Sequence, residues 1–90
     1  MKHATDPALD RLEPLLAELR KLEGLTEKKR GIWHRRSQAF LHFHEDPAGL
    51  FADLRTGKDF ERFRVTTRAE RRAFLARVRR ELAIRENGRP

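Results

Sequence analysis

Residues 39–65, AFLHFHEDPAGLFADLRTGKDFERFRV, determine the fold, because apolar side chains recur there at every second position in three segments. A period of two is typical of half-buried β-strands, in which successive side chains point to opposite faces. The segments 39–45, 50–55 and 60–65 are separated by two turn-forming sequences, Asp46-Pro47-Ala48-Gly49 and Thr56-Gly57-Lys58-Asp59. We therefore predict three consecutive antiparallel strands.

A fourth strand and a helix precede these segments. Ile32-Trp33-His34 is predicted to pair with residues 39–45 around a turn near Arg36-Ser37. Further upstream, leucines at spacings of three and four predict an amphipathic helix that begins at Asp6-Pro7 and ends at Gly24: Leu9, Leu12, Leu16 and Leu19. Pro14 interrupts this pattern, and we predict that it restarts the helix.

The C-terminal part of the chain predicts a second helix. Thr67 and Glu70 match a capping box, and an apolar stripe follows at Phe74, Leu75, Val78 and Leu82. Seven arginines surround the stripe and make the exposed side strongly cationic: Arg68, Arg71, Arg72, Arg77, Arg79, Arg80 and Arg85. The predicted fold is thus α+β, a four-stranded antiparallel meander with the N- and C-terminal helices packed on one face (α-β-β-β-β-α). It forms a single domain over residues 6–86, with disordered tails at 1–5 and 87–90.

The alternation assigns a face to each strand residue. One face is almost wholly apolar and is expected to meet the helices: Leu41, Phe43, Leu50, Ala52, Leu54, Phe63 and Val65. The opposite face is expected to be open to solvent: Phe40, His42, His44, Phe51, Asp53, Arg55, Phe60, Arg62 and Arg64. Phenylalanines on an uncovered face indicate a contact surface.

Composition and charge limit the kinds of partner. The 90 residues contain no cysteine, which excludes disulfides and thiolate metal sites, and the sequence contains no apolar run of membrane-spanning length and no signal-peptide pattern. We expect a cytoplasmic bacterial protein. The net charge is +7, divided as −2 over residues 1–27 and +9 over residues 28–90, and 16 of the 21 cations are arginine. Such segregation favours an anionic partner, although a GC-rich genome would also enrich arginine.

Nucleic-acid binding through the open face is the function that the sequence favours. Phenylalanine rings can stack on bases, and arginines can hold phosphates. Histidines, which titrate near pH 6.5, could tune the affinity with pH. The predicted binding residues are Phe40, His42, His44, Phe51, Arg55, Phe60, Arg62 and Arg64.

Two other uses of this face stay open. The first is a homodimer, through the open face or an edge strand, with Phe40, Phe51 and Phe60 as its apolar centre and arginines as its rim. The second is a metal site at the His42-x-His44 pair. Its third ligand would be Asp46, His34 or Asp53, while Arg62 and Arg64 would repel a cation. The arginines could also simply be solvated, with the phenylalanines packed at strand ends.

Catalysis has little support in the sequence. There is a single serine, Ser37, and no glycine-rich phosphate loop, so we predict a protein that is not an enzyme and holds no cofactor. His42 or His44 could form an acid–base couple with Asp53, but no nucleophile accompanies it. Trp33 is expected at the margin of the core, and Lys28-Lys29-Arg30 is expected to be a basic loop that extends the cationic surface.

A family resemblance covers most of residues 15–83. The stretches LEGLTEKKRGIW (22–33) and SQAFLHFHEDPAGLFADL (37–54), followed by a capped helix, resemble the MmcQ/YjbR-like proteins. In that family a helix leads into a Leu-Pro-Gly-x-x-Glu turn, matched at 22–27 with Glu23 in place of proline. A Lys-x-Phe-Ala-like hairpin entry follows, matched at 38–40 with Gln38 in place of lysine. The resemblance implies antiparallel strands flanked by terminal helices and a loosely assigned DNA-binding role, and it identifies no catalytic residues.

Overall fold

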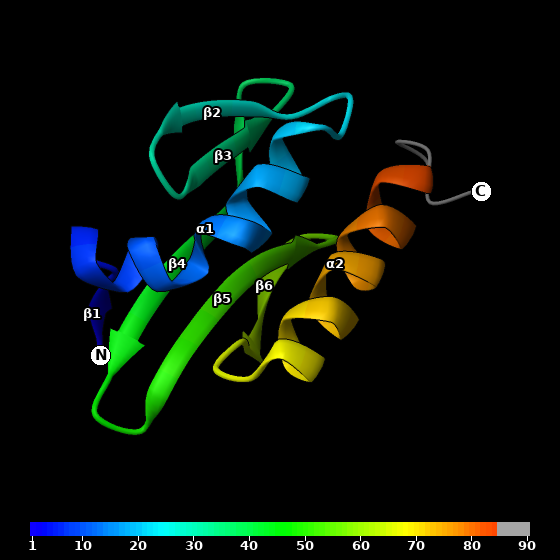
Figure 1. The fold of residues 1–90 in the computed structure, drawn as a ribbon. Helices are drawn as coiled ribbons and strands as arrows, with labels where there is room; N and C mark the ends of the chain where they lie inside the picture. Colours follow the sequence, from blue (N-terminus) through cyan, green and yellow to red (C-terminus); the bar gives the residue numbers. More distant parts are fainter. Residues whose placement is uncertain (85–90) are drawn as a thin grey trace.

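The computed structural model describes residues 1–84 and confirms an α+β fold with an antiparallel sheet between two helices in the chain (Figure 1). The predicted domain end at 86 and the predicted tail at 87–90 lie outside the described residues. The elements in chain order are β1 (Lys2–His3), α1 (Asp6–Arg20), β2 (Thr26–Lys29), β3 (Ile32–Arg35), β4 (Gln38–Asp46), β5 (Gly49–Thr56), β6 (Asp59–Arg64) and α2 (Arg68–Ala83).

The sheet is larger than the predicted four-stranded meander. Five strands follow one another in the order β2-β3-β4-β5-β6, and β1 pairs with β4 as a sixth. Two predictions about these additional strands were wrong. Thr26–Lys29 forms β2 where the sequence suggested a basic loop, and Lys2–His3 forms β1 where it suggested a disordered tail. Strand β1 finds a partner because β4 has 9 residues and β3 only 4, so the second half of the β4 edge is open to pairing.

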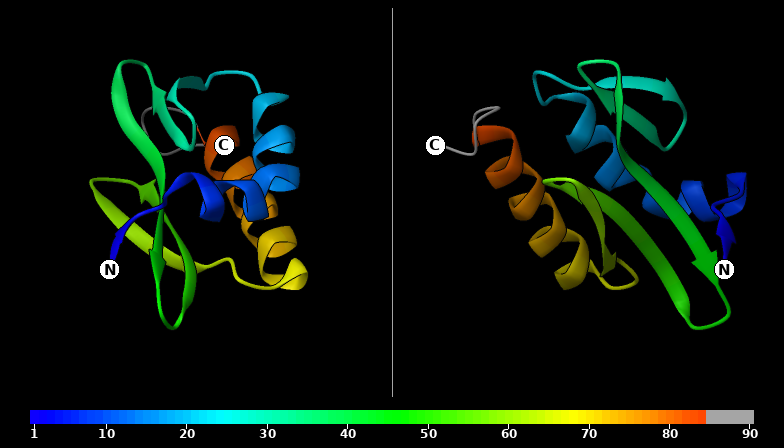
Figure 2. Two further views of the ribbon diagram at one scale, coloured as in Figure 1. Left: turned by 60° about the vertical axis from the view of Figure 1, so that its left-hand side comes forward. Right: turned by 180° about the vertical axis from the view of Figure 1, so that it is seen from behind.

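Both helices lie on the same side of the sheet, as Figure 2 shows, and they pack against each other. The leucines of α1, including the fully buried Leu12, Leu16 and Leu19, meet the apolar face of β4 and β5. Helix α1 is continuous through Pro14, so the predicted restart was wrong. Pro14 is exposed, and buried leucines on both sides of it hold the helix together despite the missing backbone hydrogen bond. Neither helix in the described part of the chain has the length and apolar character that a membrane span requires.

Helix α2 begins as the sequence predicts. Thr67 Oγ1 accepts a hydrogen bond from the Glu70 backbone N–H at 3.1 Å, and the Glu70 carboxylate accepts one from the Thr67 N–H at 2.9 Å. The capping box is therefore confirmed. Phe74, Leu75 and Val78 then point into the core.

One strand residue lies on the opposite side from its prediction. Phe40 is only 3% exposed and belongs to the core. The pairing of β3 with β4 explains this, because Trp33 faces Leu41 while the next residue, His34, faces Ala39. Phe40 is thus an extra residue on β4, a β-bulge, and it points to the same side as Leu41. Trp33 itself is fully buried, at 1% exposure, deeper than the core margin that we predicted.

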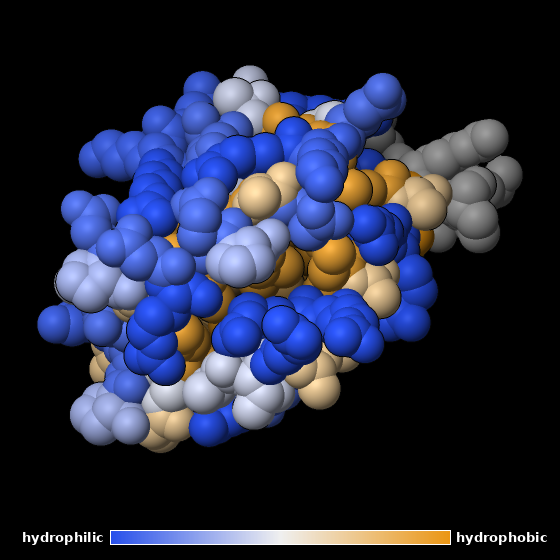
Figure 3. All heavy atoms as spheres, in the orientation of Figure 1, coloured by the Kyte–Doolittle hydropathy of each residue, from blue (hydrophilic) through white to orange (hydrophobic). Residues whose placement is uncertain are grey.

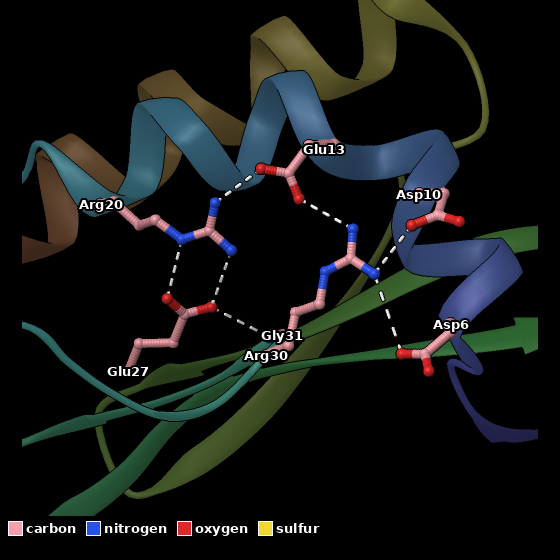
Figure 4. Close-up of polar contacts among 7 residues, drawn as sticks. All are labelled: Asp6, Asp10, Glu13, Arg20, Glu27, Arg30 and Gly31. Carbon is pink, nitrogen blue, oxygen red and sulfur yellow. Dashed lines mark hydrogen bonds and ion pairs between the residues drawn. The ribbon is translucent and has the colours of Figure 1, made fainter.

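An ion-pair network fastens α1 to the β2–β3 hairpin (Figure 4). Arg20 joins Glu13 of the same helix to Glu27 of β2, with nitrogen–oxygen distances of 2.6 and 2.8 Å. Arg30 reaches from the hairpin turn to Asp10 and Glu13 at 2.8 Å each. The sequence suggested that Arg30 extends a cationic surface beside α2. Instead, Arg30 faces carboxylates of α1.

This network predicts a loss of stability in acid. The Arg20 guanidinium lowers the pKa of Glu27 below its ordinary value of 4.5, and this outweighs the opposite effect of burial. A carboxylate with a lowered pKa in the folded state stabilises the protein above its unfolded pKa, and this contribution disappears as the pH falls through the folded value. We expect Glu27→Gln to destabilise the protein at pH 7, and we expect this loss to become smaller as the pH falls below about 4.5, for example at about pH 3. Urea unfolding at both pH values measures the difference in free energy of unfolding between Glu27→Gln and the unaltered protein, and Glu23→Gln, at an exposed position, is the control. A difference that does not change with pH would contradict the prediction.

Candidate functional site

The strand register brings most of the predicted site residues together on the side of the sheet away from the helices. His42 faces Asp53, which faces Arg62; His44 faces Phe51, which faces Arg64; and Arg55 faces Phe60. Strand β1 adds His3 beside His44. We call this surface the outer sheet face, and it comprises His3, His42, His44, Phe51, Asp53, Arg55, Phe60, Arg62 and Arg64. Phe40 is the predicted member that it lacks, because the bulge turns Phe40 inward.

The three arginines of the outer sheet face are all engaged by acceptors within the chain. Arg62 forms a bidentate pair with Asp53, with distances of 2.8 and 2.9 Å. Arg64 donates to the Ala48 carbonyl and lies 3.3 Å from Glu70. Arg55 donates to the carbonyls of Ala39 and Lys58. A phosphate would have to displace carboxylates from two of these three guanidinium groups.

The aromatic rings of this face are also partly covered. The Arg64 guanidinium lies 5.8 Å from the centre of the Phe51 ring, and Phe51 is only partly exposed. Phe60 is 37% exposed, with Arg55 at 4.6 Å over its ring and His42 at 5.0 Å beside it. With Phe40 buried, the row of three exposed rings that the sequence predicted is reduced to Phe60 and part of Phe51.

Three histidines cluster at one end of the outer sheet face. The ring centres of His42 and His44 lie 4.8 Å apart, and His3 lies 4.9 Å from His44 and 5.8 Å from His42. Asp53 is the buried anion beside them, with Oδ2 at 3.1 Å from His44 Nε2. Burial opposes ionisation of Asp53, but the hydrogen bonds and charge of Arg62 lower its pKa overall. Burial, followed by the charge of His44, lowers the pKa of His42.

A second candidate surface lies between the two helices. A groove of about 310 Å³, which we call the helix groove, is lined by Pro14, Leu15, Glu18, Arg68, Arg71, Arg72 and Leu75. Figure 3 shows apolar surface flanked by hydrophilic side chains on this side of the molecule, where α1 and α2 lie next to each other. The helix groove therefore combines an apolar floor with a cationic wall.

The charge in the helix groove is not neutralised by carboxylates. Arg71 donates to the carbonyls of Val65 and Thr66, which are neutral acceptors, and within residues 1–84 neither Arg68 nor Arg72 has an ion-pair partner. The one carboxylate of the groove, Glu18, is bonded to Lys21 at 2.8 Å. Cations in the first turns of a helix oppose the helix dipole, so this arrangement costs stability and strengthens the positive field at the N-terminus of α2.

Sequence reasoning missed His3, and it recognised the arginines of α2 without predicting the groove that they line. His3 lies in a strand of two residues, which is too short to show a period, so no sequence signal placed it beside His44. The sequence predicted that the arginines of α2 form a cationic side of the helix, and the capping box predicted where the helix begins. The position of that side relative to α1 depends on tertiary packing, which the periodicity does not contain.

Comparisons with protein families, with curated proteins and with solved structures give no match for this chain, so the resemblance to MmcQ/YjbR-like proteins stays a prediction.

Proposed function

We propose that this protein binds nucleic acid through its helix groove, with Arg68, Arg71 and Arg72 as the phosphate-binding residues. The observation that carries the proposal is that three guanidinium groups line one groove and none of them is paired with a carboxylate in the described chain. Arginine suits phosphate because its planar fork can donate two parallel hydrogen bonds to one phosphate group.

The helix groove is a better phosphate site than the outer sheet face, which the sequence favoured. On the sheet, Arg62 and Arg64 already contact Asp53 and Glu70, so a nucleic acid would gain little net charge interaction there. In the helix groove the same interaction requires no carboxylate to leave. The proposed contact is to the backbone of the nucleic acid and is therefore largely independent of base sequence. This function fits the cytoplasmic location that the sequence predicts.

The test is fluorescence anisotropy with single- and double-stranded oligonucleotides over a range of salt concentrations. We expect the Arg68→Glu/Arg72→Glu double variant to bind about tenfold more weakly or worse, because two attractive interactions with phosphates become repulsive. The slope of log affinity against log salt is expected to fall by about 0.7–0.9 for each phosphate that the variant no longer neutralises. The matched control is Lys28→Glu/Lys29→Glu, which makes the same change in net charge on β2. Equal losses in both variants, or no salt-dependent binding by the unaltered protein, would overturn the proposal.

The homodimer stays a second prediction, in a weaker form. Its proposed apolar centre consisted of Phe40, Phe51 and Phe60, and the first of these is buried while the second lies under Arg64. The edge strand β6 carries four charged residues among its six, Asp59, Glu61, Arg62 and Arg64, and charges on an edge strand discourage pairing between edges.

A further inference from the structure

Three imidazoles from two strands converge on the outer sheet face, on the opposite side of the sheet from the helix groove. His3 and His44 are direct cross-strand neighbours, and His42 lies two residues before His44 on the same face. One nitrogen from each ring can be chosen so that all three lie within 4.8 Å of one another. His34, the remaining histidine of the chain, is not part of this group.

We propose that His3, His42 and His44 bind one divalent transition-metal ion of the zinc class. Two ligand nitrogens on a tetrahedral ion with bonds of about 2.0–2.1 Å lie roughly 3.3 Å apart. His42 Nδ1 and His44 Nε2 are 2.9 Å apart, so they need to separate only slightly to accept the ion. His3 is exposed and lies on a two-residue strand, so its ring has room to complete the set. Neutral imidazole is a preferred ligand for zinc, nickel and copper.

The hydrogen bonds in the cluster indicate which proton the ion replaces. Asp53 is held as a carboxylate by Arg62, so its Oδ2 accepts, and His44 Nε2 must carry the hydrogen between them. The same nitrogen faces His42 Nδ1, whose lone pair therefore points into the cluster. For His44 Nε2 to bind an ion, its hydrogen has to move to Nδ1, so that the imidazole stays neutral, and the contacts of the Nε2–H group with Asp53 and His42 are replaced by the bond to the ion.

The surroundings favour a cation more than the sequence suggested. Arg62 lies close by, but its charge is offset by the bidentate pair with Asp53, and the Asp53 carboxylate stands between Arg62 and His44. Because Asp53 Oδ2 lies 3.1 Å from His44 Nε2, the nitrogen that would bind the ion, the carboxylate lies where it can balance the charge of the ion directly. The Phe60 ring lies beside His42, with 5.0 Å between the ring centres.

The first experiment is isothermal titration calorimetry of Zn²⁺ into the protein, which is first treated with a chelator and carries no added histidines. The second is the visible absorption spectrum of bound Co²⁺, which reports the ligand geometry. We expect one ion per chain and a tetrahedral Co²⁺ spectrum. His3→Ala, His42→Ala and His44→Ala should each weaken binding about 100-fold, with circular dichroism confirming the fold, whereas the control His34→Ala should bind normally. Asp53→Asn should weaken binding about tenfold through its place beside His44.

Three results would overturn the inference. The first is the absence of saturable Zn²⁺ binding by the folded protein. The second is an equal loss in His34→Ala, which would indicate nonspecific binding by surface histidines. The third is dependence on His3 without dependence on His42 or His44, which would place the ion on the chain terminus. Because the site is separate from the helix groove, the Arg68→Glu/Arg72→Glu variant should bind Zn²⁺ like the unaltered protein, and failure of either proposal leaves the other testable.

Discussion

Phe40→Ala is expected to lower the free energy of unfolding by about 3–5 kcal/mol, the usual cost of deleting a buried phenylalanine. The ring is 3% exposed and lies in the core, with the Arg35 guanidinium 5.7 Å from its centre. Because the bulge residue has no cross-strand partner on β3, the packing of its side chain is what holds the chain in the bulged conformation. Urea unfolding followed by circular dichroism measures the loss.

Phe60→Ala is the matched control for this prediction. The Phe60 ring is 37% exposed and contacts mainly Arg55 and His42, so its removal should cost about 1 kcal/mol. The sequence alone places the two phenylalanines on the same open face and predicts similar, small effects. If the two variants unfold at the same urea concentration, this result would contradict the β-bulge and the inward position of the Phe40 side chain.

Gly49→Ala is expected to destabilise the protein by about 2–4 kcal/mol, from backbone strain and overpacking together. Gly49 has φ of +144°, and a Cβ added there would clash with Thr66 Oγ1. That hydroxyl accepts a hydrogen bond from the Leu50 N–H at 2.9 Å and joins the start of β5 to the segment before α2. An alanine would therefore displace Thr66 from the first residues of β5.

Gly57 provides the control for Gly49. It also has positive φ, +88°, but a Cβ there would have no atom within 4 Å. Gly57→Ala should therefore show the backbone cost alone, about 1–2 kcal/mol. Thermal unfolding of both variants tests the comparison, and a Gly57→Ala loss as large as that of Gly49→Ala would mean that the contact with Thr66 contributes nothing.

The alternation of side chains was enough to predict the β4–β5–β6 core of the sheet. Leu41, Phe43 and Leu54 are buried, and His42 and His44 lie on the other face. The pattern is reliable there because the pairing is continuous, so the period of two persists across β4 and β5. It failed at Phe40 because a bulge shifts the register by one residue, and nothing in the local composition distinguishes a bulged phenylalanine from an outward one.

The elements and interactions that the sequence missed depend on distant parts of the chain. Strand β1 is too short to carry a periodic signal, and it forms because β4 extends beyond β3. The sequence assigned the arginines of β6 to phosphate binding, but their pairing with Asp53 and Glu70 follows from tertiary positions. In the same way, the sequence does not show that Arg68 and Arg72 lack carboxylate partners among the described residues. The structure shows this because Glu18, the carboxylate that lines the helix groove, is paired with Lys21.

The most direct measurement of the proposed function is an NMR titration of the isotope-labelled protein with a mixed pool of short oligonucleotides. The phosphate interactions proposed for the helix groove predict shifts at the Nε–H groups of Arg68, Arg71 and Arg72 and at nearby amides of α1, with little change at Phe60 and Arg62. Shifts confined to the outer sheet face, or none at all at low salt, would contradict the account.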